Sequence, residues 1–141
     1  MSLCMLIAAD KPLPLCSRKT ERSRTVEIEG EQFTVSCLSG FSVEEHNYYR
    51  DAVNVLDYPI KDYRYELSLE EEEADLQSLR DYLLEQFAPG EEVELWSIWL
   101  GDYEGKEIPV FQKISVQELD MDAVHMLCNG HLRECRLSVK I

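Results

Sequence analysis

The sequence lacks a long hydrophobic run. Its opening, Met1–Asp10, has no basic residue and an apolar stretch of only about seven residues, which is shorter than a secretory signal or a membrane span requires. We therefore expect Cys4–Ala9 to be a buried β-strand. The same absence predicts a cytoplasmic protein that does not enter a membrane.

Positive charge is also scarce. The chain of 141 residues has 14 Lys and Arg against 28 Asp and Glu, a formal net charge of −14. A field this negative repels phosphate groups, so nucleic acids and anionic membranes are poor partners. A protein partner is expected to be basic, although the ordinary role of such charge is solubility.

The common catalytic motifs are missing as well. There is no glycine-rich phosphate loop, His-Glu-x-x-His, Gly-x-Ser-x-Gly or EF-hand pattern, and no cofactor is predicted. The cysteines are five, an odd number, and Cys4, Cys16 and Cys37 form no Cys-x-x-Cys pair, which indicates reduced thiols. Cys37 ends a predicted strand, where nucleophiles occur, and His46 is a candidate base for it.

Four residue types that bind zinc do occur close together near the C-terminus. They are His125, Cys128, His131 and Cys135. Asn129-Gly130 predicts a hairpin turn between them, which would place Cys135 about 13 Å along the strand from His131. A zinc ion holds all its ligands at about 2.0–2.3 Å, so we predict no metal here. The alternative is a helix over 116–128, which would put His125 and Cys128 on one face.

A second candidate site combines aromatic side chains with a carboxylate. Trp96 and Trp99 lie in a predicted strand, and Asp102 and Tyr103 follow in a tight loop. Such residues can line a small-ligand pocket, although they are more often core residues and a polar turn.

What is present most clearly is one helix, predicted over 69–87. Ser68 and Glu71 form a capping box, and Glu70–Glu73 are acids at the positive end of the helix dipole. An apolar stripe with helical spacing follows, and Pro89-Gly90 ends the helix. The residues of this stripe are Leu76, Leu79, Leu83 and Phe87, with Tyr82 beside them.

Alternating or apolar segments predict the strands. We expect a loop over 10–24, a half-buried hairpin of 25–29 and 32–38, a strand over 63–67 and a central strand over 93–100, apolar on both faces. A hairpin loop over 101–105 leads to a return strand over 108–114, whose Pro109 places it at an edge. The C-terminal hairpin joins 124–128 to 131–141.

Two further capping boxes predict helical segments. Ser42-Val-Glu-Glu45 predicts a helix that extends to about Val55, and Ser115-Val-Gln-Glu118 predicts a single turn.

Two segments, Cys4–Pro14 and Val93–Asp102, resemble a family of small uncharacterised bacterial proteins. Members of that family often carry a Gly-Cys-Gly-Cys-Gly-Phe run after a mid-chain strand, which this sequence lacks. The resemblance implies no activity, cofactor or partner.

These observations together predict a single α+β domain. A mostly antiparallel sheet of five to seven strands is expected, with the helix over 69–87 packed on one face to bury its single stripe. We expect a non-catalytic module that binds a protein partner or a small ligand. A small enzyme with a cysteine thiol or a zinc centre is the alternative.

Overall fold

The computed structural model describes residues 2–101, 109–128 and 133–141. Seven strands form one sheet in the order β2-β5-β6-β1-β7-β9-β8, and β3 and β4 form a separate ribbon. This confirms the expected single α+β domain. The elements are β1 Ser2–Ala9, β2 Cys16–Ser17, β3 Thr20–Ile28, β4 Glu31–Ser39, β5 Ser42–Glu45, α1 Arg50–Asn54, β6 Tyr63–Ser68, α2 Glu73–Gln86, β7 Glu92–Leu100, β8 Val110–Ser115, η1 Val116–Glu118, α3 Met121–Cys128 and β9 Cys135–Lys140.

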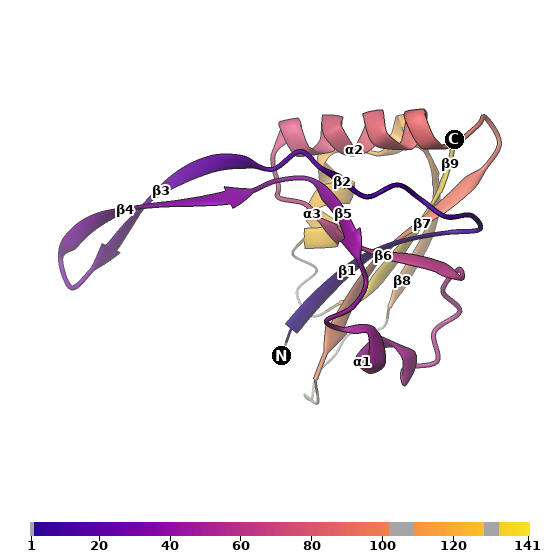
Figure 1. The fold of residues 1–141 in the computed structure, drawn as a ribbon, viewed down its shortest axis with the longest axis horizontal. Helices are drawn as coiled ribbons and strands as arrows, with labels where there is room; N and C mark the ends of the chain where they lie inside the picture. The colour runs from indigo at the N-terminus through magenta and orange to yellow at the C-terminus, as the bar shows by residue number, and fades with distance from the viewer. Residues whose placement is uncertain (1, 102–108, 129–132) are drawn as a thin grey trace.

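Helices lie on both sides of the sheet (Figure 1), and each face of the sheet contributes to an apolar core. On one face α2 and α3 pack against the sheet through side chains such as Leu79 and Val124. On the other face α1 contributes Val53 to a smaller cluster that includes Trp96. The expected strand over 93–100 is β7, which lies inside the sheet between β1 and β9 and carries apolar side chains on both faces, as predicted.

The main helix is confirmed, but it begins later than the sequence suggested. Ser68 is the last residue of β6 and pairs with Ser42, so it does not cap the helix. The N-cap is Glu72, which makes no side-chain capping bond. Asp75 instead accepts a hydrogen bond from the backbone N–H of Glu70 at 2.8 Å and holds the turn before α2. The predicted apolar stripe is buried along its whole length.

The helix predicted from Ser42 to Val55 is wrong in its first part. Ser42–Glu45 is strand β5, and only Arg50–Asn54 is helical. Ser42 and Val43 are fully buried and pair with β6, so sheet pairing and burial outweigh the local capping signal.

The expected return strand after β7 has the wrong partner. Its residues form β8 at the edge of the sheet, as Pro109 indicated, but β8 runs parallel to β9 instead of antiparallel to β7. A parallel pair needs a crossover connection, and η1 and α3 supply it. The capping box of Ser115 and Glu118 is confirmed in η1, whereas the predicted loop over 101–105 lies largely outside the described residues.

The predicted C-terminal hairpin is also wrong. Met121–Cys128 is helix α3, in keeping with the alternative interpretation, and the described part of the other arm is β9. β9 pairs antiparallel with β7 and parallel with β8. Asn129 and Gly130 lie outside the described residues.

The expected hairpin over 25–38 is confirmed and is longer than predicted. Its turn is Glu29-Gly30, where both residues have the positive φ of a two-residue type I′ turn, 52° and 80°. Part of the loop predicted over 10–24 is therefore strand, namely β2 and the start of β3. The predicted half-burial is wrong, because Val26, Ile28, Phe33 and Val35 are all exposed.

The helices that the structure describes are all too short or too polar to cross a membrane.

Candidate functional site

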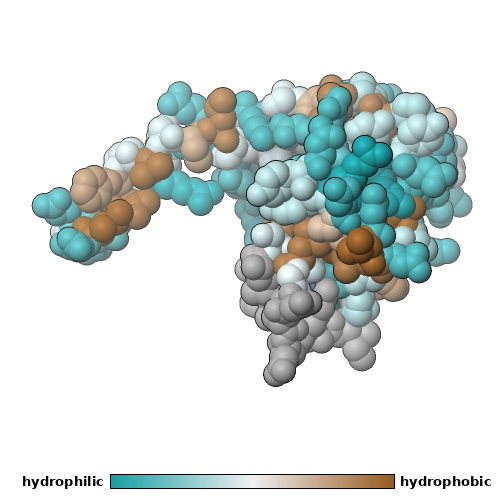
Figure 2. All heavy atoms as spheres, turned by 60° about the horizontal axis from the view of Figure 1, so that its bottom comes forward, coloured by the Kyte–Doolittle hydropathy of each residue, from teal (hydrophilic) through white to brown (hydrophobic). Residues whose placement is uncertain are grey.

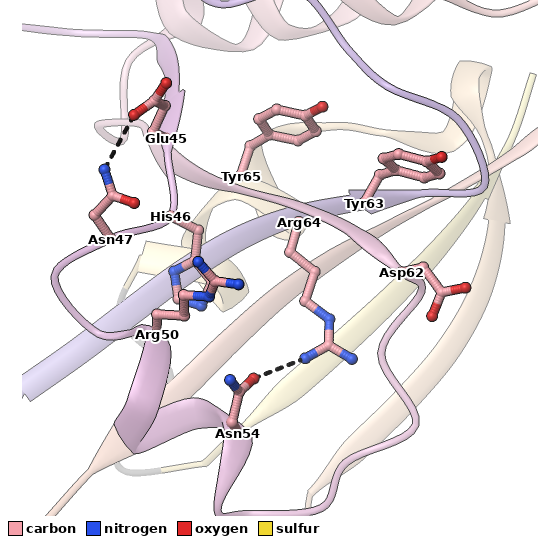
Figure 3. A pocket seen from close by; sticks show the side chains of 9 residues that line it. All are labelled: Glu45, His46, Asn47, Arg50, Asn54, Asp62, Tyr63, Arg64 and Tyr65. Atoms are coloured by element: carbon pink, nitrogen blue, oxygen red, sulfur yellow. Dashed lines mark hydrogen bonds between the residues drawn. The ribbon is translucent and has the colours of Figure 1, made fainter.

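A polar cavity of about 570 Å³ lies where β5 ends beside β6 (Figure 3). β5 pairs with β6 only as far as Glu45 and Tyr65, so the edge of β6 at Tyr63 and Arg64 is open. Helix α1 borders this opening and contributes Arg50 and Asn54. We call this cavity the His46 pocket; it is lined by Glu45, His46, Asn47, Arg50, Asn54, Asp62, Tyr63, Arg64 and Tyr65.

His46 is the buried polar residue of this pocket. Its side chain is only 5% exposed, and its Nδ1 lies 3.6 Å from Oε1 of Glu66, which is too long for a good hydrogen bond. Neither ring nitrogen has a hydrogen-bond partner, and Oε1 of Glu66 has none either. Burial lowers the pKa of His46 although Glu66 opposes this, so the imidazole is neutral near neutral pH.

Two guanidinium groups stand beside this histidine. Arg64 donates to the carbonyls of Lys61 and Ile60 and to Oδ1 of Asn54, and Figure 3 shows it pointing away from Tyr63 and Tyr65. Arg50 is exposed on α1. The positive charges of both arginines also disfavour a protonated His46 and lower its pKa.

The sequence indicated only His46 among these residues. Arg64 and Glu66 alternate with Tyr65 in β6, a pattern typical of a solvent-facing strand side. Arg64 lines the His46 pocket and Glu66 lies beside His46, because α1 and the end of β5 border that side of the sheet. The alternation by itself does not indicate that a cavity lies beside these residues.

The candidate pair Cys37 and His46 belongs to different parts of the molecule. Cys37 is exposed on β4 of the ribbon, opposite Arg22. His46 follows β5 and lies beside Glu66, and the same Glu66 disfavours a thiolate at Cys4 of β1. Burial raises the pKa of Cys4 to about 12, so this thiol stays protonated and is a poor nucleophile.

The aromatic candidates do not form one site. Trp96 is 1% exposed in the smaller core cluster, where it stacks on Tyr58 with ring centroids 5.7 Å apart. Trp99 is three positions further along the regular strand β7, so it faces the opposite side of the sheet. Asp102 and Tyr103 lie outside the described residues.

Three of the zinc candidates lie in the described residues, and each has another environment. His125 contacts Glu71 through Nδ1 at 2.7 Å, and the Cys128 thiol donates to the carbonyl of Leu69. Burial raises the pKa of Cys128 and of Cys135 to about 12, whereas zinc binds the thiolate. Within residues 2–101, 109–128 and 133–141, no group of three or more potential ligands converges; His131 is outside these ranges.

The cysteines should therefore differ sharply in reactivity. At about pH 8, iodoacetamide is expected to alkylate exposed Cys37 first and to leave Cys4 and Cys135 unmodified, because burial keeps these thiols protonated and inaccessible. Peptide mass spectrometry measures the labelling, with urea-unfolded protein as the control, in which all sites should react. Equal labelling of Cys37 and Cys135 in folded protein would contradict this.

The β3–β4 ribbon is the second unusual feature, since it projects from the body of the molecule (Figure 1). The register pairs Val26 with Phe33, and Ile28 and Val35 share their side of the ribbon. These four residues, which we call the apolar ribbon face, are 37%, 46%, 56% and 50% exposed for Val26, Phe33, Ile28 and Val35. Figure 2 shows hydrophobic side chains along this arm.

The other side of the ribbon is mostly polar. Ser36 donates to the carboxylate of Glu21 at 2.8 Å and lies 3.4 Å from the hydroxyl of Ser23. The large apolar side chain on this polar side is Leu38, which is 71% exposed.

Charged contacts attach the base of the ribbon to the start of α2. Arg22 makes two hydrogen bonds to the buried carboxylate of Asp75, at 2.6 and 3.3 Å, and another to Glu70 at 3.0 Å. Arg24 lies 3.3 Å from Glu70. Arg22 and Arg24 lie on the same side of the ribbon as the apolar ribbon face. At the base of the ribbon this side contacts the start of α2, and further out the described residues leave it uncovered.

No known protein family, curated protein or solved structure matches this chain. Its function has to be inferred from its own residues.

Proposed function

We propose that this protein is a non-catalytic binding module, and that its apolar ribbon face docks a basic protein partner. The supporting observation is the exposure of four large apolar side chains on one side of a projecting ribbon. A two-stranded hairpin has no core of its own and is marginally stable in water. Contiguous exposed apolar side chains of this kind are typical of interaction surfaces.

The charge of the ribbon supports a basic partner. Its outer half, residues 25–36, contains Glu27, Glu29 and Glu31 but no Lys or Arg. The whole chain has a net charge of −14, so two copies repel each other, whereas a basic surface is attracted. A second copy of this chain is therefore the less favoured occupant.

The enzyme alternative has weaker support. The thiols of Cys4, Cys128 and Cys135 are held protonated by burial, and exposed Cys37 lies on the ribbon, whereas His46 follows β5. A nucleophilic or zinc-binding thiol needs the opposite environment, one that favours the thiolate.

The test replaces two residues of the apolar ribbon face. Ile28→Ser with Phe33→Ser is expected to weaken binding of a basic partner by about tenfold or more, because apolar anchors dominate interface energy. Proteins captured from extracts on the wild type but not on the double variant are identified, purified and titrated directly by calorimetry. Raising the salt concentration should weaken this binding further.

The matched control is Leu38→Ser, which removes an exposed apolar side chain from the opposite side of the ribbon and should leave affinity unchanged. Equal losses in both variants, an acidic partner, or no protein that distinguishes wild type from the double variant would each overturn the proposal. So would a dimer, seen by light scattering, that the double variant abolishes, because a second copy would then cover the ribbon.

A further inference from the structure

The His46 pocket contains two arginines that lack an acidic partner. Several basic side chains of this acidic protein pair with carboxylates, as Arg22 does with Asp75 and Lys61 does with Asp10 at 2.7 Å. Among the described residues, neither Arg50 nor Arg64 has a carboxylate within 4 Å. With 28 acidic residues against 14 basic ones, leaving two guanidinium groups unpaired beside one cavity points to an anion supplied from outside.

The buried histidine indicates a second requirement. Buried polar atoms nearly always have a hydrogen-bond partner, yet both ring nitrogens of His46 lack one. A neutral imidazole has one N–H and one bare nitrogen. The negative Glu66, 3.6 Å from Nδ1, favours placing the proton on Nδ1. Nε2 is then a buried acceptor without a donor, and its lone pair favours positive charge placed near it.

The rim of the pocket carries the opposite charge. Glu45 makes no ion pair with either arginine, and its carboxylate accepts a hydrogen bond from Asn47 at 3.1 Å. Asp62 is exposed at the other end of the cavity (Figure 3). These carboxylates disfavour a multiply charged anion such as phosphate. They attract a cationic group on a ligand whose anionic end lies at Arg50.

We propose that the His46 pocket binds a small zwitterion of the amino-acid type, with its carboxylate at Arg50 and its ammonium group near His46 and the acidic rim. The cavity of about 570 Å³ has the volume of a small-molecule site. Arg50 supplies charge-assisted hydrogen bonds to the carboxylate. Arg64 is held by Asn54 and two carbonyls, so it contributes a fixed positive charge.

The experiment follows the ring signals of His46 by NMR, which the small number of histidines, three, makes tractable. L-Alanine and L-glutamine are titrated in parallel with acetate, methylammonium and inorganic phosphate. Saturable shifts with the two amino acids are expected, at affinities at least about tenfold higher than with acetate, methylammonium or phosphate, because only a zwitterion satisfies both groups of charges. Absent saturation with the amino acids, or equal affinity for acetate or phosphate, would overturn the proposal.

Arg50→Gln removes the proposed carboxylate contact. Arg50 is exposed and makes no side-chain hydrogen bond or ion pair within the described residues, so the variant should fold normally. It is expected to weaken amino-acid binding by about tenfold or more, the effect of losing a charge-assisted hydrogen bond. Lys113→Gln, an exposed change of equal charge on β8, is the matched control and should bind as the wild type does. Unchanged affinity in Arg50→Gln, or an equal loss in both variants, would contradict the assignment.

Discussion

Leu79→Ala in helix α2 is expected to lower the free energy of unfolding by about 2–5 kcal/mol, the range for deleting a buried leucine side chain. Leu79 is 0% exposed and belongs to the larger core cluster between α2 and the sheet. The loss combines the transfer free energy of the removed atoms with the cost of the cavity that they leave. Urea unfolding measures it, with the midpoint and the slope fitted separately.

Leu84→Ala is the control for this change, because Leu84 lies on the same helix but is 56% exposed. Helix propensity changes equally in the two variants, so their difference reports burial alone. We expect Leu84→Ala to change stability by at most about 0.5 kcal/mol. Similar values for both substitutions would mean that α2 does not bury its stripe against the sheet.

Asp75→Ala is the second change with a large expected effect, a loss of about 3 kcal/mol. The Asp75 side chain is 3% exposed, and it satisfies both the guanidinium of Arg22 and the backbone N–H of Glu70. Removing it leaves these partly buried donors with poorer partners. Because Arg22 attaches the ribbon to α2, hydrogen exchange of the β3 and β4 amides should also become faster.

Asp81→Ala provides the comparison, since Asp81 is an aspartate of the same helix whose carboxylate accepts only an exposed hydrogen bond from Gln77 at 2.8 Å. Its replacement should cost at most about 0.5 kcal/mol and leave exchange in the ribbon unchanged. If Asp75→Ala destabilises the protein without affecting exchange in β3 and β4, Asp75 supports only the start of α2 and does not hold the ribbon.

Local patterns in the sequence were sufficient for several elements. The leucine stripe of α2, the two apolar faces of β7 and the alternation of β9 each follow from a periodicity that burial imposes. The hairpin over 25–38 follows from alternation and a glycine turn. Together they predicted the α+β class and most of the strands, because a periodicity can be read from residues close in the chain.

The candidate sites were much less predictable. His46 was identified, but its neighbours Arg50, Arg64 and Glu66 come from α1 and β6. Their convergence depends on where β5 stops pairing with β6, which is a property of the sheet. The predicted site at Trp96 and Trp99 is not formed by this pair, because two residues three positions apart in a strand point to opposite faces of the sheet.

Only the tertiary structure decided which elements the ambiguous segments form. Ser42–Glu45 has the capping box of a helix, yet it is a strand because β6 offers it backbone partners and burial. Met121–Cys128 is a helix because the parallel pairing of β8 with β9 requires a crossover. Alternation in β3 and β4 predicted a half-buried hairpin, but the apolar side is exposed, because no described element covers it beyond the base of the ribbon. The sequence by itself determined the periodicity of each segment, whereas long-range pairing determined what each face meets.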